Sequence, residues 1–167
     1  MELHMHSHHY VARTPDWTAA AVAGFVAGAV VMVMELFWST VIINVSPWAA
    51  SHLVAAILMG PDVLQSVGFS MGVVIMALVI HYVLGAVFGA ILAAIIAPFH
   101  FDSSVGMSLL VGAVFGLALY AFNFYGMVRF YPWFAEMQNG VVMLTHMLFG
   151  MTAAVMYRQL ERARPED

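Results

Sequence analysis

Residues 17–43, WTAAAVAGFVAGAVVMVMELFWSTVII, contain a single charged side chain, that of Glu35. A helix needs about 20 mostly apolar residues to cross the hydrocarbon core of a bilayer. Runs of that length occur four times, and the predicted spans are 17–43, 69–98, 105–128 and 140–157. Because lipid offers no hydrogen-bond partners to free backbone groups, each run must be helical. The sequence therefore predicts an all-α integral membrane protein, a bundle of four transmembrane helices.

The composition of the whole chain favours the same class. Of its 167 residues, 63% are hydrophobic and 8% are charged, whereas about a quarter of the residues of a soluble domain are charged. The mean hydropathy is +0.93. Five basic residues stand against nine acidic ones, so the basic surface that nucleic acid requires is missing. The chain has no cysteine, which excludes disulfides and thiolate metal sites. The expected partner is the lipid bilayer.

Polar or irregular segments separate the spans. Residues 1–16 form a polar, histidine-rich tail, and residues 158–167 form a charged tail. Residues 44–68 carry an apolar stripe that polar residues interrupt, and this segment is too short to cross the membrane twice. We expect it to lie flat on the membrane surface or to form a shallow re-entrant helix. The other connections are short, so neighbouring spans are expected to be antiparallel.

Two parts of the chain match each other in order. The matched pairs are Gly24 with Gly112, Gly28 with Gly116, Glu35 with Asn123, His81 with His146, Gly85 with Gly150, and Gly89 with Ala154. A Pro-Trp pair also follows the first span of each part. Small residues four apart let helices approach closely in lipid, so these eight small residues are expected to mark the packed faces. We interpret the chain as two tandem helical hairpins, 17–98 and 99–157, related by a pseudo-two-fold axis along the membrane normal.

Four polar side chains share the packed faces. Glu35 lies 11 residues after Gly24, which corresponds to three helical turns plus about 20°. Asn123 bears the same relation to its own span, and His81 and His146 each lie one turn before a matched glycine. All four are expected in the half of the bundle away from the termini. The sequence therefore predicts one buried polar layer.

This layer is compatible with three interpretations. Its members could form interhelical hydrogen bonds of about 1 kcal/mol each that fix the packing. An ionised carboxylate near mid-membrane costs about 2.5–3.5 kcal/mol, so Glu35 and the histidines could instead move a proton or coordinate an ion. Alternatively, His81 and His146 could bind haem b or copper. The N-terminal tail adds four candidate copper ligands, His4, His6, His8 and His9.

The chain lacks the motifs of a catalytic domain. It has no glycine-rich phosphate loop, no HExxH and no serine set beside a base. We therefore do not expect it to be an enzyme by itself.

The arginines predict an orientation. Four of the five lie on the side that holds both termini: Arg13, Arg158, Arg162 and Arg164. Arg129 lies on the opposite side. Since cytoplasmic loops carry the excess of basic residues, both termini are predicted to be cytoplasmic. Aromatic residues near the span ends, Tyr157 among them, are expected at the membrane interfaces.

Residues 120–162, YAFNFYGMVRFYPWFAEMQNGVVMLTHMLFGMTAAVMYRQLER, resemble a group of short uncharacterised bacterial four-helix inner-membrane proteins, as do AAILMG at 55–60 and HYVLGAVFGAIL at 81–92. Some members of that group are labelled sodium:proline symporter. The resemblance covers most of the chain after Trp17 and implies a bacterial inner (plasma) membrane protein. Similar proteins look like neighbours of respiratory oxidase components. The resemblance thus implies a non-catalytic accessory subunit of a larger, respiratory-type membrane complex.

Two alternative functions follow from the residues themselves. The protein could act as a small homo-oligomeric transporter of an ion or solute that uses Glu35. It could also be a haem b or copper protein that uses His81 and His146. The expected partners are other membrane subunits or further copies of this chain.

Overall fold

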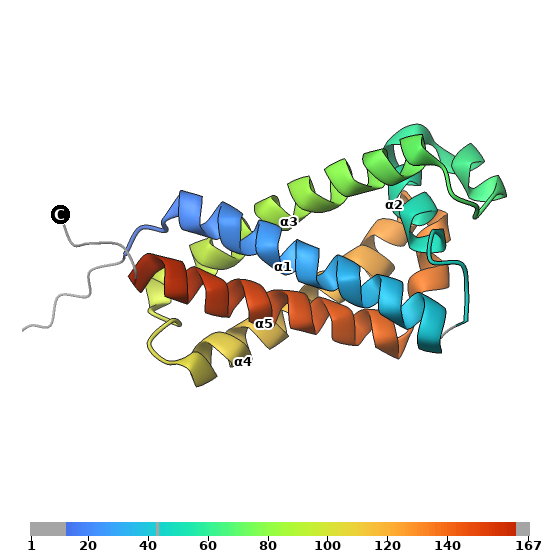
Figure 1. Ribbon diagram of the computed structural model, residues 1–167. Helices are drawn as coiled ribbons and strands as arrows, with labels where there is room; N and C mark the ends of the chain where they lie inside the picture. The colour runs from blue at the N-terminus through green and yellow to red at the C-terminus, as the bar shows by residue number, and fades with distance from the viewer. Residues whose placement is uncertain (1–12, 43, 163–167) are drawn as a thin grey trace, which may run out of the picture.

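The computed structural model describes residues 13–42 and 44–162, and no strand occurs among them (Figure 1). The five α-helices are α1 (Trp17–Phe37), α2 (Ala49–Met59), α3 (Met71–Phe99), α4 (Val105–Ala121) and α5 (Gly140–Arg162). α1 and α4 continue as π-helical turns, η1 (Trp38–Ile42) and η3 (Phe122–Gly126). Short 3₁₀ segments complete the chain: η2 (Pro61–Gln65), η4 (Met127–Arg129) and η5 (Pro132–Met137).

Four helical segments are long and apolar enough to cross a membrane. They are Trp17–Ile42, Met71–Phe99, Val105–Arg129 and Gly140–Arg162, with mean hydropathies between 1.5 and 2.4. The prediction of an all-helical protein with four long apolar helices is confirmed. The last helix differs from its predicted span, because it continues beyond Tyr157 to Arg162.

The helix ends are fixed by side chains that satisfy free backbone N–H groups. The Asp16 carboxylate accepts hydrogen bonds from the N–H groups of Thr18 and Ala19, both at 3.0 Å. At the start of α4, the Ser104 hydroxyl accepts from the N–H of Met107. Before α5, the Asn139 side chain accepts from Val142. Caps of this kind are worth about 1 kcal/mol each, so the helices begin where such residues precede the apolar runs.

The long helices are arranged around α1 and α5, which pack along each other. α3 packs on α1 and α4 packs on α5, whereas α3 and α4 contact each other little. The described ends of the chain and the α3–α4 connection lie at one end of the bundle (Figure 1). α2 and the 3₁₀ segments lie at the other, which we call the distal end.

Glycines allow α1 and α3 to approach at backbone distance. A Cβ atom at Gly89 would lie 2.7 Å from the Cα of Gly24, and one at Gly85 would lie 2.9 Å from the Gly24 carbonyl oxygen. Side chains do not fit at such distances, so this interface depends on the missing Cβ atoms.

The α4–α5 interface is built in the same manner. A Cβ atom at Gly116 would lie 2.6 Å from the Cα of Met147, and one at Gly150 would lie 3.0 Å from the backbone nitrogen of Gly116. Gly112 meets the backbone of Gly150 equally closely. Between α1 and α5 the small residues are alanines, and Ala20, Ala27 and Ala154 are fully buried there. The bundle is held together by close contact between backbones.

Candidate functional site

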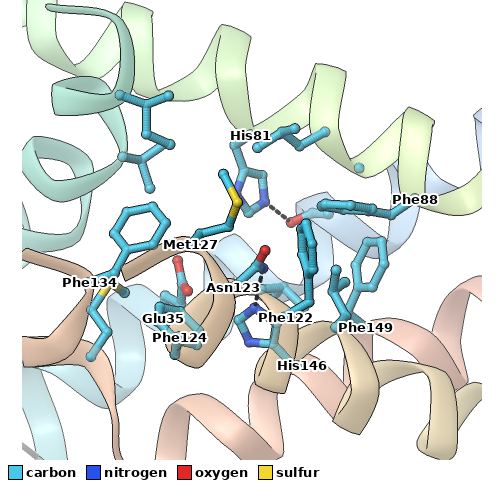
Figure 2. A pocket seen from close by; sticks show the side chains of 18 of the residues that line it. Glu35, His81, Phe88, Phe122, Asn123, Phe124, Met127, Phe134, His146 and Phe149 are labelled. Atoms are coloured by element: carbon cyan, nitrogen blue, oxygen red, sulfur yellow. Dashed lines mark hydrogen bonds between the residues drawn. The ribbon is translucent and has the colours of Figure 1, made fainter. Parts of the chain in front are cut away.

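A cavity of about 290 Å³ lies in the distal half of the bundle (Figure 2). The four polar residues singled out in the sequence all line it: Glu35, His81, Asn123 and His146. They come from α1, α3, η3 and α5. At 1.5 Å per helical residue, His146 lies about 9 Å and His81 about 15 Å from the distal starts of α5 and α3. The tertiary structure therefore brings the whole polar layer to one space.

The carboxyl group of Glu35 points into this cavity (Figure 2). None of the described residues donates a hydrogen bond to it; the hydroxyl of Ser39 bonds instead to the backbone carbonyl of Glu35. The nearest charge partner is His81, with which the carboxyl interacts electrostatically. Both carboxyl oxygens therefore remain available to a bound molecule.

His81 links α3 to α1. Its Nε2 lies 2.8 Å from the carbonyl oxygen of Gly28. Because a carbonyl can only accept, Nε2 carries the hydrogen, and in a neutral ring Nδ1 is then an acceptor. At Gly28 a Cβ atom would lie 3.4 Å from this Nε2 atom, so the glycine leaves room for the imidazole.

His146 is held in the opposite tautomer. Its Nδ1 lies 2.9 Å from the carbonyl oxygen of Val142 and must donate to it. Nε2 then accepts from the side-chain amide nitrogen of Asn123, at a long distance of 3.4 Å. This assignment turns the Oδ1 of Asn123 away from His146 and leaves it as an acceptor. The polar side of the cavity thus presents acceptors: the Glu35 carboxyl, the Nδ1 of His81 and the Oδ1 of Asn123.

The remaining wall is apolar and rich in aromatic rings. Six aromatic residues line the cavity: Phe88, Phe122, Phe124, Tyr131, Phe134 and Phe149. Two methionines join them, Met127 and Met137. The sequence analysis did not assign Phe122, Phe124, Tyr131 and Phe134 to the site. They lie in a mixture of 3₁₀ and π turns, where apolar residues do not recur at one regular spacing that would show which face is buried. The only available signal was the local density of aromatic residues in 120–134.

The cavity is uncovered on the side between α3 and α4. Leu84 of α3 and Phe122 of η3 both line the cavity, yet they are 38% and 57% exposed. α3 and α4 make little contact with each other. On this side a transmembrane bundle faces hydrocarbon, so the mouth of the cavity opens laterally.

The distal end of the cavity is roofed by α2 and by the segment after η3. Val54 and Ile57 of α2 lie on one side, and Tyr131, Phe134 and Met137 on the other. The indole Nε1 of a roof tryptophan, Trp133, donates to the carbonyl oxygen of Leu53 at 3.1 Å and joins the two parts. The segment predicted to lie on the membrane surface or to re-enter it therefore forms part of the site.

A second, smaller cavity of about 40 Å³ adjoins the first. Glu35 and His81 line both, and Pro47, Ser51 and Ala77 are among the other residues around the small one. A volume of this size accommodates water. The pair of Glu35 and His81 therefore separates a large apolar space from a small one beside α2.

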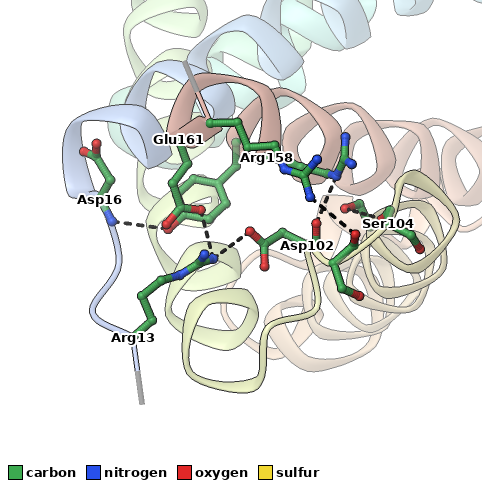
Figure 3. Close-up of polar contacts among 10 residues, drawn as sticks. Arg13, Asp16, Asp102, Ser104, Arg158 and Glu161 are labelled. Carbon is green, nitrogen blue, oxygen red and sulfur yellow. Dashed lines mark hydrogen bonds and ion pairs between the residues drawn. The ribbon is translucent and has the colours of Figure 1, made fainter. Parts of the chain in front are cut away.

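At the opposite end of the bundle, Asp102 is the centre of a polar cluster (Figure 3). The guanidinium of Arg13 donates to Asp102 at 2.6 Å and to Glu161 at 3.1 Å. Arg158 donates to the backbone carbonyl of Asp102 at 2.9 Å, and Arg162 donates to that of Ser103 at 3.3 Å. These contacts join the start of α1, the α3–α4 connection and the end of α5.

Tyr157 belongs to this end of the molecule but not to its surface. Its hydroxyl accepts the backbone N–H of Asp16 at 3.2 Å, and the residue is only 1% exposed. Its depth beside the start of α1 is compatible with the expected interface, but the side chain is buried within the bundle and does not face outward. Its ring fills the core beside α1, and the hydroxyl satisfies a backbone group that precedes the helix.

The histidines do not form a metal centre of three protein ligands within the described residues. His81 and His146 each engage one ring nitrogen with a backbone carbonyl. The other candidate copper ligands, His4, His6, His8 and His9, lie outside the part of the chain that the structure describes. Haem b or copper binding stays a prediction.

No protein-family model matches the chain, and neither a curated protein nor a solved structure matches it.

Proposed function

We propose that this protein is a membrane solute-binding protein, which takes a small, largely apolar molecule from the bilayer into the cavity at Glu35. The observation that carries the proposal is an apolar cavity of about 290 Å³ with an unengaged carboxyl on its wall. Its exposed lining residues, Leu84 and Phe122, lie on the side between α3 and α4. Binding sites for small molecules are typically apolar pockets of about 300 Å³ or more with a few convergent polar groups. Transport through Glu35 would begin with this binding step.

The position of the carboxyl supports a functional role. Placing Asp or Glu inside a membrane is costly, and such residues commonly belong to substrate or ion pathways. A purely structural carboxyl would be expected to accept hydrogen bonds from neighbouring helices. Glu35 accepts none from the described residues and instead borders two cavities.

A neutral probe tests the proposed binding. In nanodiscs with ¹³C-methyl methionine, propylbenzene should shift the methyl resonances of Met127 and Met137, which line the cavity, while Met71 at the start of α3 reports partition into lipid. Ile57→Trp fills the roof of the cavity and should abolish the shifts. Leu58→Trp, the next residue on α2 and 68% exposed, should retain them. Absence of any saturable shift in the folded protein would overturn the proposal.

We also propose a two-repeat architecture, in which the hairpins 17–98 and 99–157 are related by a pseudo-two-fold axis along the membrane normal. Its support is the equivalence of the closest approaches, since Gly24 meets the backbone of Gly85 as Gly112 meets the backbone of Gly150. The next glycines differ in detail: Gly28 faces the side chain of His81, whereas Gly116 lies against the backbone of His146. The two histidines also bond to different carbonyls. Duplication followed by divergence of the polar layer accounts for both observations.

The accessory-subunit function implied by the resemblance is a second proposal for the same molecule, at the bacterial inner membrane. Phe130 and Tyr125, 69% and 65% exposed beside Arg129, offer an apolar surface with a charge at the distal end. Such a surface suits a neighbouring subunit. Native mass after extraction in mild detergent tests this proposal: co-migration with larger polypeptides supports it, and a homo-oligomer overturns it.

A further inference from the structure

Three polar groups of the cavity, those of Glu35, His81 and Asn123, require the same kind of partner. With the tautomers that the carbonyls of Gly28 and Val142 impose, the cavity presents oxygen and nitrogen acceptors but no free imidazole N–H. A buried acceptor left without a donor costs about 1–3 kcal/mol. A solute that brings N–H donors satisfies these groups, whereas one that has only acceptor atoms faces like groups.

The charge of the cavity also favours a solute that carries N–H donors. No arginine is among the residues that line the cavity in the described part of the chain, and the sequence has no lysine. The ionisable side chain that acts on this carboxylate is His81, whose ring is neutral in the tautomer given above, so no cationic side chain offsets the burial of the carboxylate. A positively charged solute would supply the missing counter-charge to Glu35.

The aromatic wall provides a second means of recognising a cation. Phe122, Phe124 and Phe134 line the same cavity as the Glu35 carboxyl (Figure 2), and Phe122 is exposed. Aromatic faces attract ammonium groups by about 0.5–2 kcal/mol, and more strongly where water is excluded. A cavity that combines a carboxylate with aromatic rings is therefore suited to an organic ammonium group with an apolar body.

We propose that the solute of this cavity is a small organic cation, a protonated amine on an apolar or aromatic body. The ammonium group lies at Glu35 and donates to the Nδ1 of His81 and the Oδ1 of Asn123, and the body lies among the phenylalanines toward the mouth. This inference rests on the proposed function, since it names the class of solute that the binding site takes.

Two probes of equal size separate charge from shape. 2-Phenylethylamine, protonated at neutral pH, and propylbenzene have the same number of heavy atoms and differ in an ammonium group against a methyl group. Each is titrated into the protein in phosphatidylglycerol nanodiscs while the Met127 and Met137 methyl resonances are followed. These lipids contain no amine, so any shift comes from the added probe. A second sample in phosphatidylethanolamine, without probe, shows whether a lipid headgroup occupies the site.

The amine is expected to bind about tenfold or more tightly than propylbenzene, and Glu35→Gln should remove this preference. Thermal unfolding in detergent shows whether the variant is folded, and Leu58→Trp, which lies outside the cavity, should retain the preference for the amine. Equal affinity of the two probes, or an amine affinity that Glu35→Gln does not alter, would overturn the inference while leaving solute binding intact. Failure of both probes to bind the folded wild-type protein would overturn the proposed function and the inference together.

Discussion

Asp102 and Glu35 lie in opposite halves of the bundle, and of these two carboxyl groups only Asp102 has an arginine partner among the described residues. Asp102 is 4% exposed and accepts from Arg13, so its burial is offset by charge. Glu35 has no arginine within reach in the described structure and borders the cavity instead. The Asp102 carboxylate therefore has a structural role at the end that holds the termini, whereas the Glu35 carboxyl is accessible to a ligand in the cavity.

The contact between Arg13 and Asp102 predicts a dependence of stability on pH. Burial acts to raise the pKa of Asp102, but the hydrogen bond and the positive charge of Arg13 outweigh it, so this pKa lies below the ordinary value of 3.8. A lowered folded-state pKa stabilises the protein above the unfolded value, and this contribution is lost as the pH falls through the folded value. Asp102→Asn should therefore lower stability at pH 7 by about 1 kcal/mol.

Thermal unfolding in detergent at pH 7 and near pH 3 measures this effect. The difference between wild type and Asp102→Asn should shrink at the lower pH, because below about 3.8 the carboxylate of the unfolded chain binds a proton that the folded protein binds less readily. Asp62→Asn, an exposed position at the distal end, serves as the control and should change little. An undiminished difference at low pH would show that the pair with Arg13 is not its source.

At the scale of elements, the site depends on two helices that leave α-helical geometry at the depth of the cavity. Glu35 lies just before η1, and Asn123 lies within η3. The hydroxyls of Ser39 and Thr40 bond to carbonyls four residues earlier and compete with the backbone N–H groups there. π turns of this kind often occur at functional sites. In η3, the three consecutive residues Phe122, Asn123 and Phe124 all line the cavity.

The α1–α3 contact predicts a sharp difference between two glycines. A Cβ atom at Gly24 would lie 2.9 Å from backbone atoms of both Gly85 and Gly89, which cannot move aside as a side chain could. Gly24→Ala should lower the free energy of unfolding by about 1–3 kcal/mol through overpacking. Gly72→Ala in α3 is the matched control, since nothing lies within 4 Å of its Cβ position. Thermal unfolding of both variants in the same detergent measures this difference. Equal stabilities of Gly24→Ala and Gly72→Ala would contradict the close approach of α1 to α3.

At the scale of the whole molecule, the sequence predicts the features that repeat locally. The apolar runs locate the four long helices, and the 11-residue spacing from Gly24 to Glu35 places the carboxyl on the packed face. Contacts between distant segments carry no such local signal. α5 extends to Arg162 because Arg158 and Arg162 bond to carbonyls of the α3–α4 connection. The roof of the cavity likewise depends on a bond from Trp133 to a helix 80 positions earlier.

The predicted orientation of the bundle in the membrane can be tested directly with single introduced cysteines, because the chain has none of its own. Ser103 is exposed at the end that holds the termini, and Ser66 is exposed at the distal end. Because four of the five arginines lie on the side of the termini, that side is expected in the cytoplasm. In intact cells an impermeant maleimide should label Ser66→Cys, but should label Ser103→Cys only after permeabilisation. The reverse pattern, or labelling of both variants in intact cells, would contradict cytoplasmic termini; it would also place the roof of the cavity, with α2, on the cytoplasmic side in some or all copies.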